Sequence, residues 1–391
     1  MKIGIFVLGM VGVLSFAQGE PVAGGSAHHH ALSIARDEAR IRAGISDQEP
    51  WVGLIGDSGI TGAATSLDLD PNFWSLGKLI ANFLGESRRT VQIADPARVP
   101  GLADFGIADQ ERLSPLVRVV YSQAEFQEAV KDGRRYEKNL EAKGSLRLDI
   151  PEYSFGYLLA RGLGVPAERI VLTAQDGRRV GAILEQAERL REVSPSMPSL
   201  LLISFTANDL CGDELQGSLE AFRAQFRAEV HRQLHGLISG YRPHPKLGTR
   251  VVITAPLDVP QILTNENLLA QEVDFQGRGR IACGEIRENR AAITSLGTKM
   301  QETLVSMCRS IVPTSRHNAA TIQKIRAFQN EQIEVWREVV AQLPETSGWS
   351  FEVRDENRAP RFAKGDLAND CFHPGPGAHA KIARELLRAL K

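Results

Sequence analysis

Short apolar runs alternate with longer amphipathic segments along most of the chain. Five short apolar runs have the length and composition expected of strands buried in a parallel sheet. They cover residues 51–56, 169–173, 200–205, 250–255 and 349–354. Helical spacing of apolar residues predicts helices over residues 73–84, 153–163, 179–193, 219–238, 286–308, 319–343 and 376–390. This alternation predicts a three-layer α/β/α sandwich around a central, mostly parallel five-stranded sheet of the flavodoxin-like type.

The segment from about residue 95 to 150 does not follow this alternation. It is rich in charge, and its local signals are weak, such as a capping box formed by Ser122 and Glu125. We therefore predict an insertion after the first strand–helix unit. Such an insertion beside a site can be a substrate lid, or it can be decoration.

The composition is that of a large folded chain. The 391 residues are 43% hydrophobic and 24% charged, enough apolar material for one large domain over residues 51–391. The formal net charge of −1 gives no reason to expect nucleic acid as a partner.

The N-terminus has the layout of a secretory signal peptide. Lys2 precedes an apolar run over residues 3–16, and Ser15 and Ala17 are small residues suited to a cleavage site. We predict a signal peptide over residues 1–17 and an exported protein, periplasmic or secreted. A retained membrane anchor is the alternative.

An N-terminal extension then covers residues 18–50, with a short charged helix over 31–43. Its three adjacent histidines, His28, His29 and His30, could hold a metal ion, but they fit a solvated segment better. The four cysteines of the chain are Cys211, Cys283, Cys308 and Cys371. An even number in an exported chain suggests disulfides, although their pairing stays open. A metal site and plain buried thiols are the alternatives.

Three polar residues near the first and last strands have the chemistry of a nucleophile with its base. Ser58 follows the first strand in Gly56-Asp57-Ser58, a place where a hydroxyl is exposed at the mouth of a sheet. Asp370 and His373 form a D-x-x-H pair before the last helix, where the carboxylate can orient the imidazole as a general base. The simpler interpretations are helix-capping roles for Ser58 and Asp370 beside an exposed histidine.

Two further residues follow the second and third strands. The side-chain amide of Asn208 and the backbone N–H of Gly177 could donate hydrogen bonds to a developing oxyanion. An Asx turn at Asn208 and an ordinary loop glycine at 177 are the alternatives.

The order of these blocks resembles the SGNH/GDSL hydrolase superfamily, whose name comes from its Ser, Gly, Asn and His residues. The resemblance implies a serine esterase with the catalytic triad Ser58, Asp370 and His373. It implies an oxyanion hole formed by Ser58, Gly177 and Asn208, and a mechanism without metal or organic cofactor. The first turn lacks the glycine fingerprint of a nucleotide binder, which speaks against a flavodoxin-like cofactor protein.

Two motifs are similar to those of the phospholipase B branch: Asn-Asp-Leu-Cys over residues 208–211 and Asp-Cys-Phe-His-Pro over 370–374. This likeness implies a lipid acyl ester as the substrate and contact with a membrane surface through that substrate. One departure is Thr206-Ala207, where the superfamily usually has Gly before Asn-Asp. The alternatives are a carbohydrate or cell-envelope O-acetylesterase and a catalytically silent binding protein on the same fold. The oligomeric state is left open.

Overall fold

The computed structural model describes residues 45, 48–63, 65, 99–107, 116–120, 145–149, 151–175, 177–274, 280–288, 319–368 and 370–391. Several predicted features lie outside these residues: the signal peptide, the histidines at 28–30, the helices over 31–43 and 73–84, the capping box at Ser122, and Cys308.

A five-stranded parallel sheet forms the centre of the molecule, as predicted. Its strands are β1 (Val52–Gly56), β4 (Ile170–Leu172), β5 (Leu200–Ser204), β6 (Thr249–Thr254) and β9 (Trp349–Arg354). They lie in the order β4-β1-β5-β6-β9, and every neighbouring pair is parallel. All five residues of β1 are buried, which explains why its sequence is apolar without alternation.

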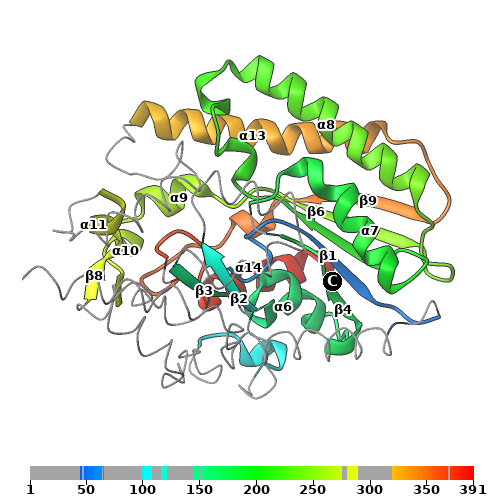
Figure 1. The fold of residues 1–391 in the computed structure, drawn as a ribbon, viewed down its shortest axis with the longest axis horizontal. Helices are drawn as coiled ribbons and strands as arrows, with labels where there is room; N and C mark the ends of the chain where they lie inside the picture. The colour runs from blue at the N-terminus through cyan, green and yellow to red at the C-terminus, as the bar shows by residue number, and fades with distance from the viewer. Residues whose placement is uncertain are drawn as a thin grey trace, which may run out of the picture.

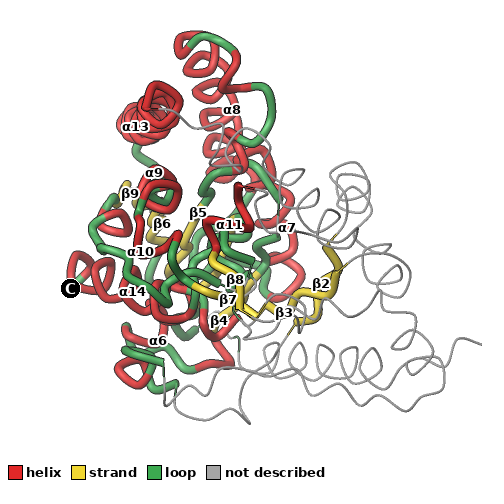
Figure 2. The backbone as a smooth tube through the Cα atoms, turned by 90° about the vertical axis from the view of Figure 1, so that its left-hand side faces the viewer, coloured by secondary structure: helices red, strands yellow, loops and turns green. Residues whose placement is uncertain are grey.

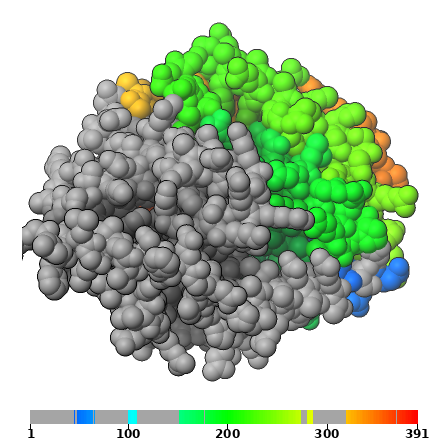
Figure 3. All heavy atoms as spheres, in the orientation of Figure 1, coloured from blue at the N-terminus to red at the C-terminus, as the bar shows by residue number. Residues whose placement is uncertain are grey.

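Helices cover both faces of the sheet (Figure 1). One layer contains α7 (Ile183–Val193), α8 (Leu219–Gly240) and α13 (Ala319–Gln342), and the other contains α6 (Phe155–Gly162) and α14 (Pro376–Leu390). The turned view in Figure 2 shows the same separation of the two layers. The predicted three-layer sandwich is therefore confirmed. The side chains of α7 and α8 also form one continuous part of the surface in Figure 3.

Aromatic side chains hold the two longest helices together. Phe222 and Phe226 of α8 lie against Phe328 and Trp336 of α13, with ring centroids 5.0 Å apart for Phe222–Phe328 and 6.0 Å apart for Phe226–Trp336. Such pairs contribute about 0.5–1.5 kcal/mol beyond the burial of their area. This packing fixes the layer that covers β6 and β9.

Two small antiparallel sheets were not predicted. β2 (Leu116–Val120) pairs with β3 (Ser145–Asp149) inside the region interpreted as an insertion. β7 (Glu272–Asp274) pairs with β8 (Arg280–Ala282) and leads into α11 (Cys283–Glu288). Helix α11 begins three residues before the helix predicted over residues 286–308. Most of that predicted helix lies outside the described residues.

The strand register aligns the carboxyl ends of the central strands. Gly56 of β1 is paired with Ser204 of β5, and Ser204 with Thr254 of β6. The chain passes from β1 to β4 on one side and returns to β5 on the other, so β1 and β5 form the point where the strand order reverses. Ligands of open α/β sheets bind at such a point, beyond the carboxyl ends.

Candidate active site

Ser58 lies in the turn that directly follows β1. The turn needs glycine at position 56, where φ is +154° and a Cβ would lie 1.9 Å from the carbonyl oxygen of Ser204. The side chain of Gln186 holds Gly56 from α7, accepting from its N–H at 2.7 Å and donating to its carbonyl at 2.9 Å. Ser58 itself is 6% exposed. The turn is thus fixed by neighbours on both sides.

His373 and Asp370 meet Ser58 from the loop before α14. The Nε2 atom of His373 lies 2.9 Å from Ser58 Oγ, and its Nδ1 atom lies 2.5 Å from Asp370 Oδ2. Asp370 and His373 are 4% and 3% exposed, so the alternative of an exposed histidine is wrong. The N-cap of α14 is Gly375, which also removes the capping role for Asp370.

Backbone hydrogen bonds shape the loop that bears this pair. The second carboxylate oxygen of Asp370 accepts from the N–H groups of Phe372 and His373, both at 3.0 Å. The loop closes on itself where Ala368 N–H donates to the His373 carbonyl at 2.8 Å. Because Asp370 accepts from both backbone and imidazole, the ring is oriented with Nδ1–H toward the carboxylate and Nε2 toward the serine.

Asn208 lies at the start of a short 3₁₀ helix after β5. Its amide nitrogen donates to Asp57 Oδ2 at 3.2 Å and to the carbonyl oxygen of Arg178 at 3.1 Å. Gly177, just before Arg178, has the left-handed backbone foreseen for a loop glycine, with φ of +70°. The structure therefore joins the turns that contain Ser58, Gly177 and Asn208.

Asp57 is a residue of this site that the sequence interpretation missed. Its carboxylate is fully buried and accepts from Gly59 N–H at 2.9 Å and from Thr206 N–H at 2.7 Å. Burial raises the pKa of Asp57 to about 6, although these hydrogen bonds act in the opposite direction. Its place between Gly56 and Ser58 is the one signal that the sequence offered.

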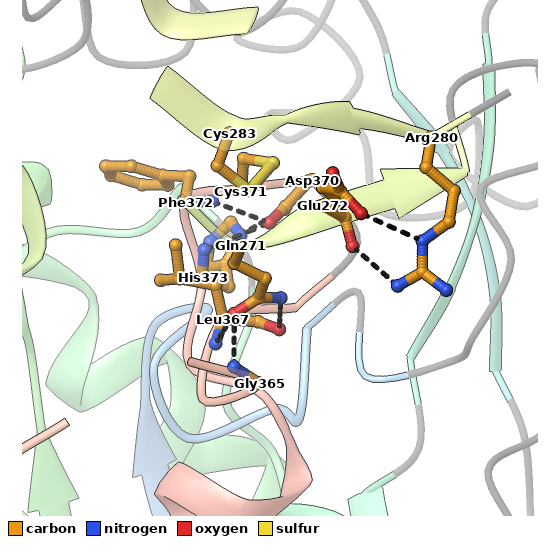
Figure 4. Close-up of a disulfide and its surroundings, with 10 residues drawn as sticks. All are labelled: Gln271, Glu272, Arg280, Cys283, Gly365, Leu367, Asp370, Cys371, Phe372 and His373. Atoms are coloured by element: carbon orange, nitrogen blue, oxygen red, sulfur yellow. Dashed lines mark hydrogen bonds and ion pairs between the residues drawn. A yellow bond between two sulfur atoms is a disulfide. The ribbon is translucent and has the colours of Figure 1, made fainter. Parts of the chain in front are cut away.

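A disulfide joins the loop to a distant segment. Cys371, between Asp370 and His373, is bonded to Cys283 at the start of α11 (Figure 4). Cys211 is disulfide-bonded as well. The expectation of disulfides is thereby confirmed, and a disulfide fits a protein of an oxidising compartment.

Gln271 attaches the same two segments a second time. Its side chain accepts from the N–H groups of Gly365 and Leu367, both at 3.0 Å, and donates to the Leu367 carbonyl at 2.8 Å (Figure 4). The backbone carbonyl of Gln271 accepts from the N–H of Cys283 at 2.7 Å. Gln271 was not foreseen from the sequence, because its partners are nearly a hundred residues away.

Two more buried titratable groups lie near the site. Burial raises the pKa of Asp209, which accepts from Val180 N–H at 3.2 Å, to about 7. Burial lowers the pKa of His379 to about 3, and the charge of His373 acts in the same direction. His379 accepts from Phe155 N–H at 3.2 Å and so links α14 to α6. Both groups are therefore uncharged over part of the neutral and acidic range.

The described residues contain no cluster of three or more His, Cys, Asp or Glu that could hold a metal ion. In the same part of the chain, no helix is both long and apolar enough to cross a bilayer.

Comparison with known families identifies the class. The profile of the GDSL-like lipase/acylhydrolase family matches residues 52–386, and the chain therefore belongs to this family. The protein is therefore an ester-hydrolysing enzyme. The family match also confirms the resemblance to the SGNH/GDSL superfamily.

Among solved structures, the chain is similar to an extracellular lipase from Streptomyces rimosus. The identity is 12% and the TM-score 0.38, over 87% of this chain and 99% of the lipase. Comparison with curated proteins gives no match.

Proposed function

We propose that this enzyme is an exported serine hydrolase of lipid acyl esters, with Ser58 as nucleophile, His373 as base and Asp370 as its partner. The observation that supports the proposal best is the continuous, buried chain of contacts from Asp370 through His373 to Ser58, at 2.5 and 2.9 Å. Such a chain is what a serine needs to become a nucleophile at neutral pH. It also speaks against a silent binding protein.

The proposed reaction has two steps. His373 Nε2 accepts the Ser58 proton as Oγ forms a bond to the ester carbonyl carbon. The ester C–O bond then breaks, and the departing alcohol oxygen takes the proton from Nε2. In the second step, water gives a proton to Nε2 and attacks the acyl carbon. Ser58 Oγ leaves, recovers that proton, and the carboxylic acid is released.

Asp370 and the proposed oxyanion donors stabilise charge in both steps. Asp370 stays ionised beside the imidazolium that forms on His373. The negative oxygen accepts from the backbone N–H groups of Ser58 and Gly177 and from the side chain of Asn208.

Lipid specificity rests on the motifs over residues 208–211 and 370–374, which are similar to those of phospholipase B enzymes. The alternative substrate is an acetylated carbohydrate or cell-envelope polymer, for which the same residues would serve. The disulfide between Cys283 and Cys371 supports export, because such bonds persist in oxidising compartments.

The test is hydrolysis of p-nitrophenyl esters from acetate to palmitate by wild type and Ser58→Ala. We expect Ser58→Ala to lose activity by at least roughly a thousandfold, with long chains preferred by wild type. Ser239→Ala, an exposed serine on α8, is the matched control and keeps full activity.

The outcomes separate the candidates. Cleavage of acetate alone would favour the O-acetylesterase. Equal rates for wild type and Ser58→Ala would refute the serine mechanism. Labelling of Ser58 by a fluorophosphonate probe gives a second readout that does not depend on the choice of ester.

A further inference from the structure

The Asp57 carboxylate is the centre of a hydrogen-bond network behind the proposed oxyanion donor. Besides the two backbone N–H groups already described, it accepts from the Thr206 hydroxyl, which lies 3.0 Å from Oδ1 and 2.9 Å from Oδ2. The amide nitrogen of Asn208 is the fourth donor. All four donors are neutral, and Asp57 is fully buried. A buried carboxylate costs free energy unless it is hydrogen-bonded, so its presence here calls for a role.

The network fixes which end of the Asn208 amide faces the site. An amide has an oxygen acceptor and a nitrogen donor of nearly the same shape, and the surrounding groups decide its orientation. The carboxylate of Asp57 and the carbonyl of Arg178 are both acceptors, so both require the nitrogen. Without the acceptor on Asp57, only the Arg178 carbonyl still selects the nitrogen, and the amide rotates more easily to present its oxygen, which would repel an oxyanion.

Thr206 holds the carboxylate in the orientation that this requires. It donates twice, from its N–H and its hydroxyl, and it lies two residues before Asn208 on the same turn. The packing leaves little freedom, because a Cβ on Gly59 would lie 2.3 Å from the Thr206 methyl group. The turn that follows Ser58 is therefore in close contact with the turn that bears Asn208.

We propose that Asp57 and Thr206 are positioning residues that act through Asn208: they keep its amide nitrogen, rather than its oxygen, beside the turn of Ser58, where the N–H given to Asp57 can be shared with the oxyanion. The inference rests on the proposed function. Neither residue takes part in proton transfer. Their effect therefore belongs to the transition state, and it lowers kcat while leaving KM nearly constant.

The experiment is a double-mutant cycle between Thr206→Val and Asn208→Ala, measured with a p-nitrophenyl ester. Valine keeps the shape of threonine and removes the hydroxyl. Alone, Thr206→Val should lower kcat roughly 10-fold, the loss of one hydrogen bond to a charged group. In the Asn208→Ala background the same change should alter kcat by less than about twofold. Thr206→Ser keeps the hydroxyl and should restore kcat to within about twofold of wild type.

Asp57→Asn gives a second, independent arm. Asparagine has the shape of aspartate, but an NH₂ group replaces one of the two carboxylate oxygens. This NH₂ group would face other hydrogen-bond donors, so the variant should lower kcat by roughly 10- to 100-fold. This loss should also disappear in the Asn208→Ala background. Circular dichroism and thermal unfolding establish that each variant is folded. If Asp57→Asn does not fold, the Thr206 cycle decides.

Equal fold losses in both backgrounds would overturn the inference, as would wild-type kcat in Thr206→Val. In either case turnover that still depends on Ser58 leaves the proposed function standing. If wild type and Ser58→Ala have the same rate, the proposed function fails and the inference fails with it.

Discussion

Asn208 is the residue whose surroundings say most about the proposed transition state. Its amide nitrogen has two acceptors, and both distances exceed 3.0 Å. Charge-assisted hydrogen bonds are usually shorter, about 2.7–2.9 Å. A negative oxygen in the site can therefore share this donor without breaking a strong contact.

Replacing Asn208 tests this role directly. We expect Asn208→Ala to lower kcat by roughly 10²–10³, as for the loss of one oxyanion donor, with little change in KM. Steady-state kinetics on a short-chain ester, together with thermal unfolding, measures both effects. A folded Asn208→Ala protein with near wild-type turnover would remove Asn208 from the mechanism.

The loop before α14 is an element built for one conformation. Cys371 has φ of +59°, a left-handed value that only glycine adopts without strain. The disulfide to Cys283 and the hydrogen bonds of Gln271 tie this loop to residues on either side of the β7–β8 pair. The positions of Asp370 and His373 thus depend on contacts with residues far away in the sequence.

Removal of the disulfide should therefore affect both stability and catalysis. The bond spans 88 residues, and loss of a native disulfide typically costs about 2–4 kcal/mol. We expect Cys283→Ala/Cys371→Ala to unfold at lower denaturant and to lose kcat, because the loop that holds Asp370 and His373 gains freedom. Urea unfolding and ester hydrolysis are the measurements.

A matched variant separates the cross-link from the backbone conformation. Cys283→Ala/Cys371→Gly also lacks the bond, but its glycine adopts the left-handed backbone freely and should recover about 1 kcal/mol. Stability equal to wild type in both double variants would contradict a bracing role for the disulfide.

The secondary-structure elements show which parts of the fold could be predicted from the sequence. Each strand of the central sheet lies in a short apolar segment, and all five were predicted to within one residue at either end. The motifs around Ser58 and His373 identified the residues that the fold brings together. By contrast, β7 and β8 have three residues each, too few to establish a period.

Contacts between residues far apart in the sequence could not be predicted either, because a local pattern contains no information about them. The hydroxyl of Thr206 meets Asp57 across 149 residues, and Gln186 meets Gly56 across 130. No local pattern records such pairs. In the sequence, Thr206-Ala207 stood out only as a departure from the usual glycine. Nothing in the sequence indicated that Thr206 contacts Asp57.

Over the whole molecule, buried titratable groups make stability depend on pH in two opposite ways. In the folded chain Asp209 keeps its proton up to about pH 7, whereas its ordinary pKa is 3.8. Between these values the folded chain binds more protons, so the free energy of unfolding falls as pH rises. Asp57 acts in the same sense up to about pH 6. His379 acts in the opposite sense, because from its ordinary 6.5 down to about 3 only the unfolded chain is protonated there.

Asp209→Asn isolates one of these contributions. Asparagine keeps an acceptor for the N–H of Val180 but does not titrate, so the stabilisation relative to wild type should be small at pH 4 and should grow by a few kcal/mol by pH 8. Urea unfolding across this range measures the difference, with Asp213→Asn, an exposed carboxylate on the same loop, as the control. A constant difference between Asp209→Asn and wild type from pH 4 to 8 would mean that Asp209 has the same pKa in the folded and unfolded chains. Burial would then not govern its charge, and the carboxylate would be ionised throughout the neutral range beside the turn that bears Asn208.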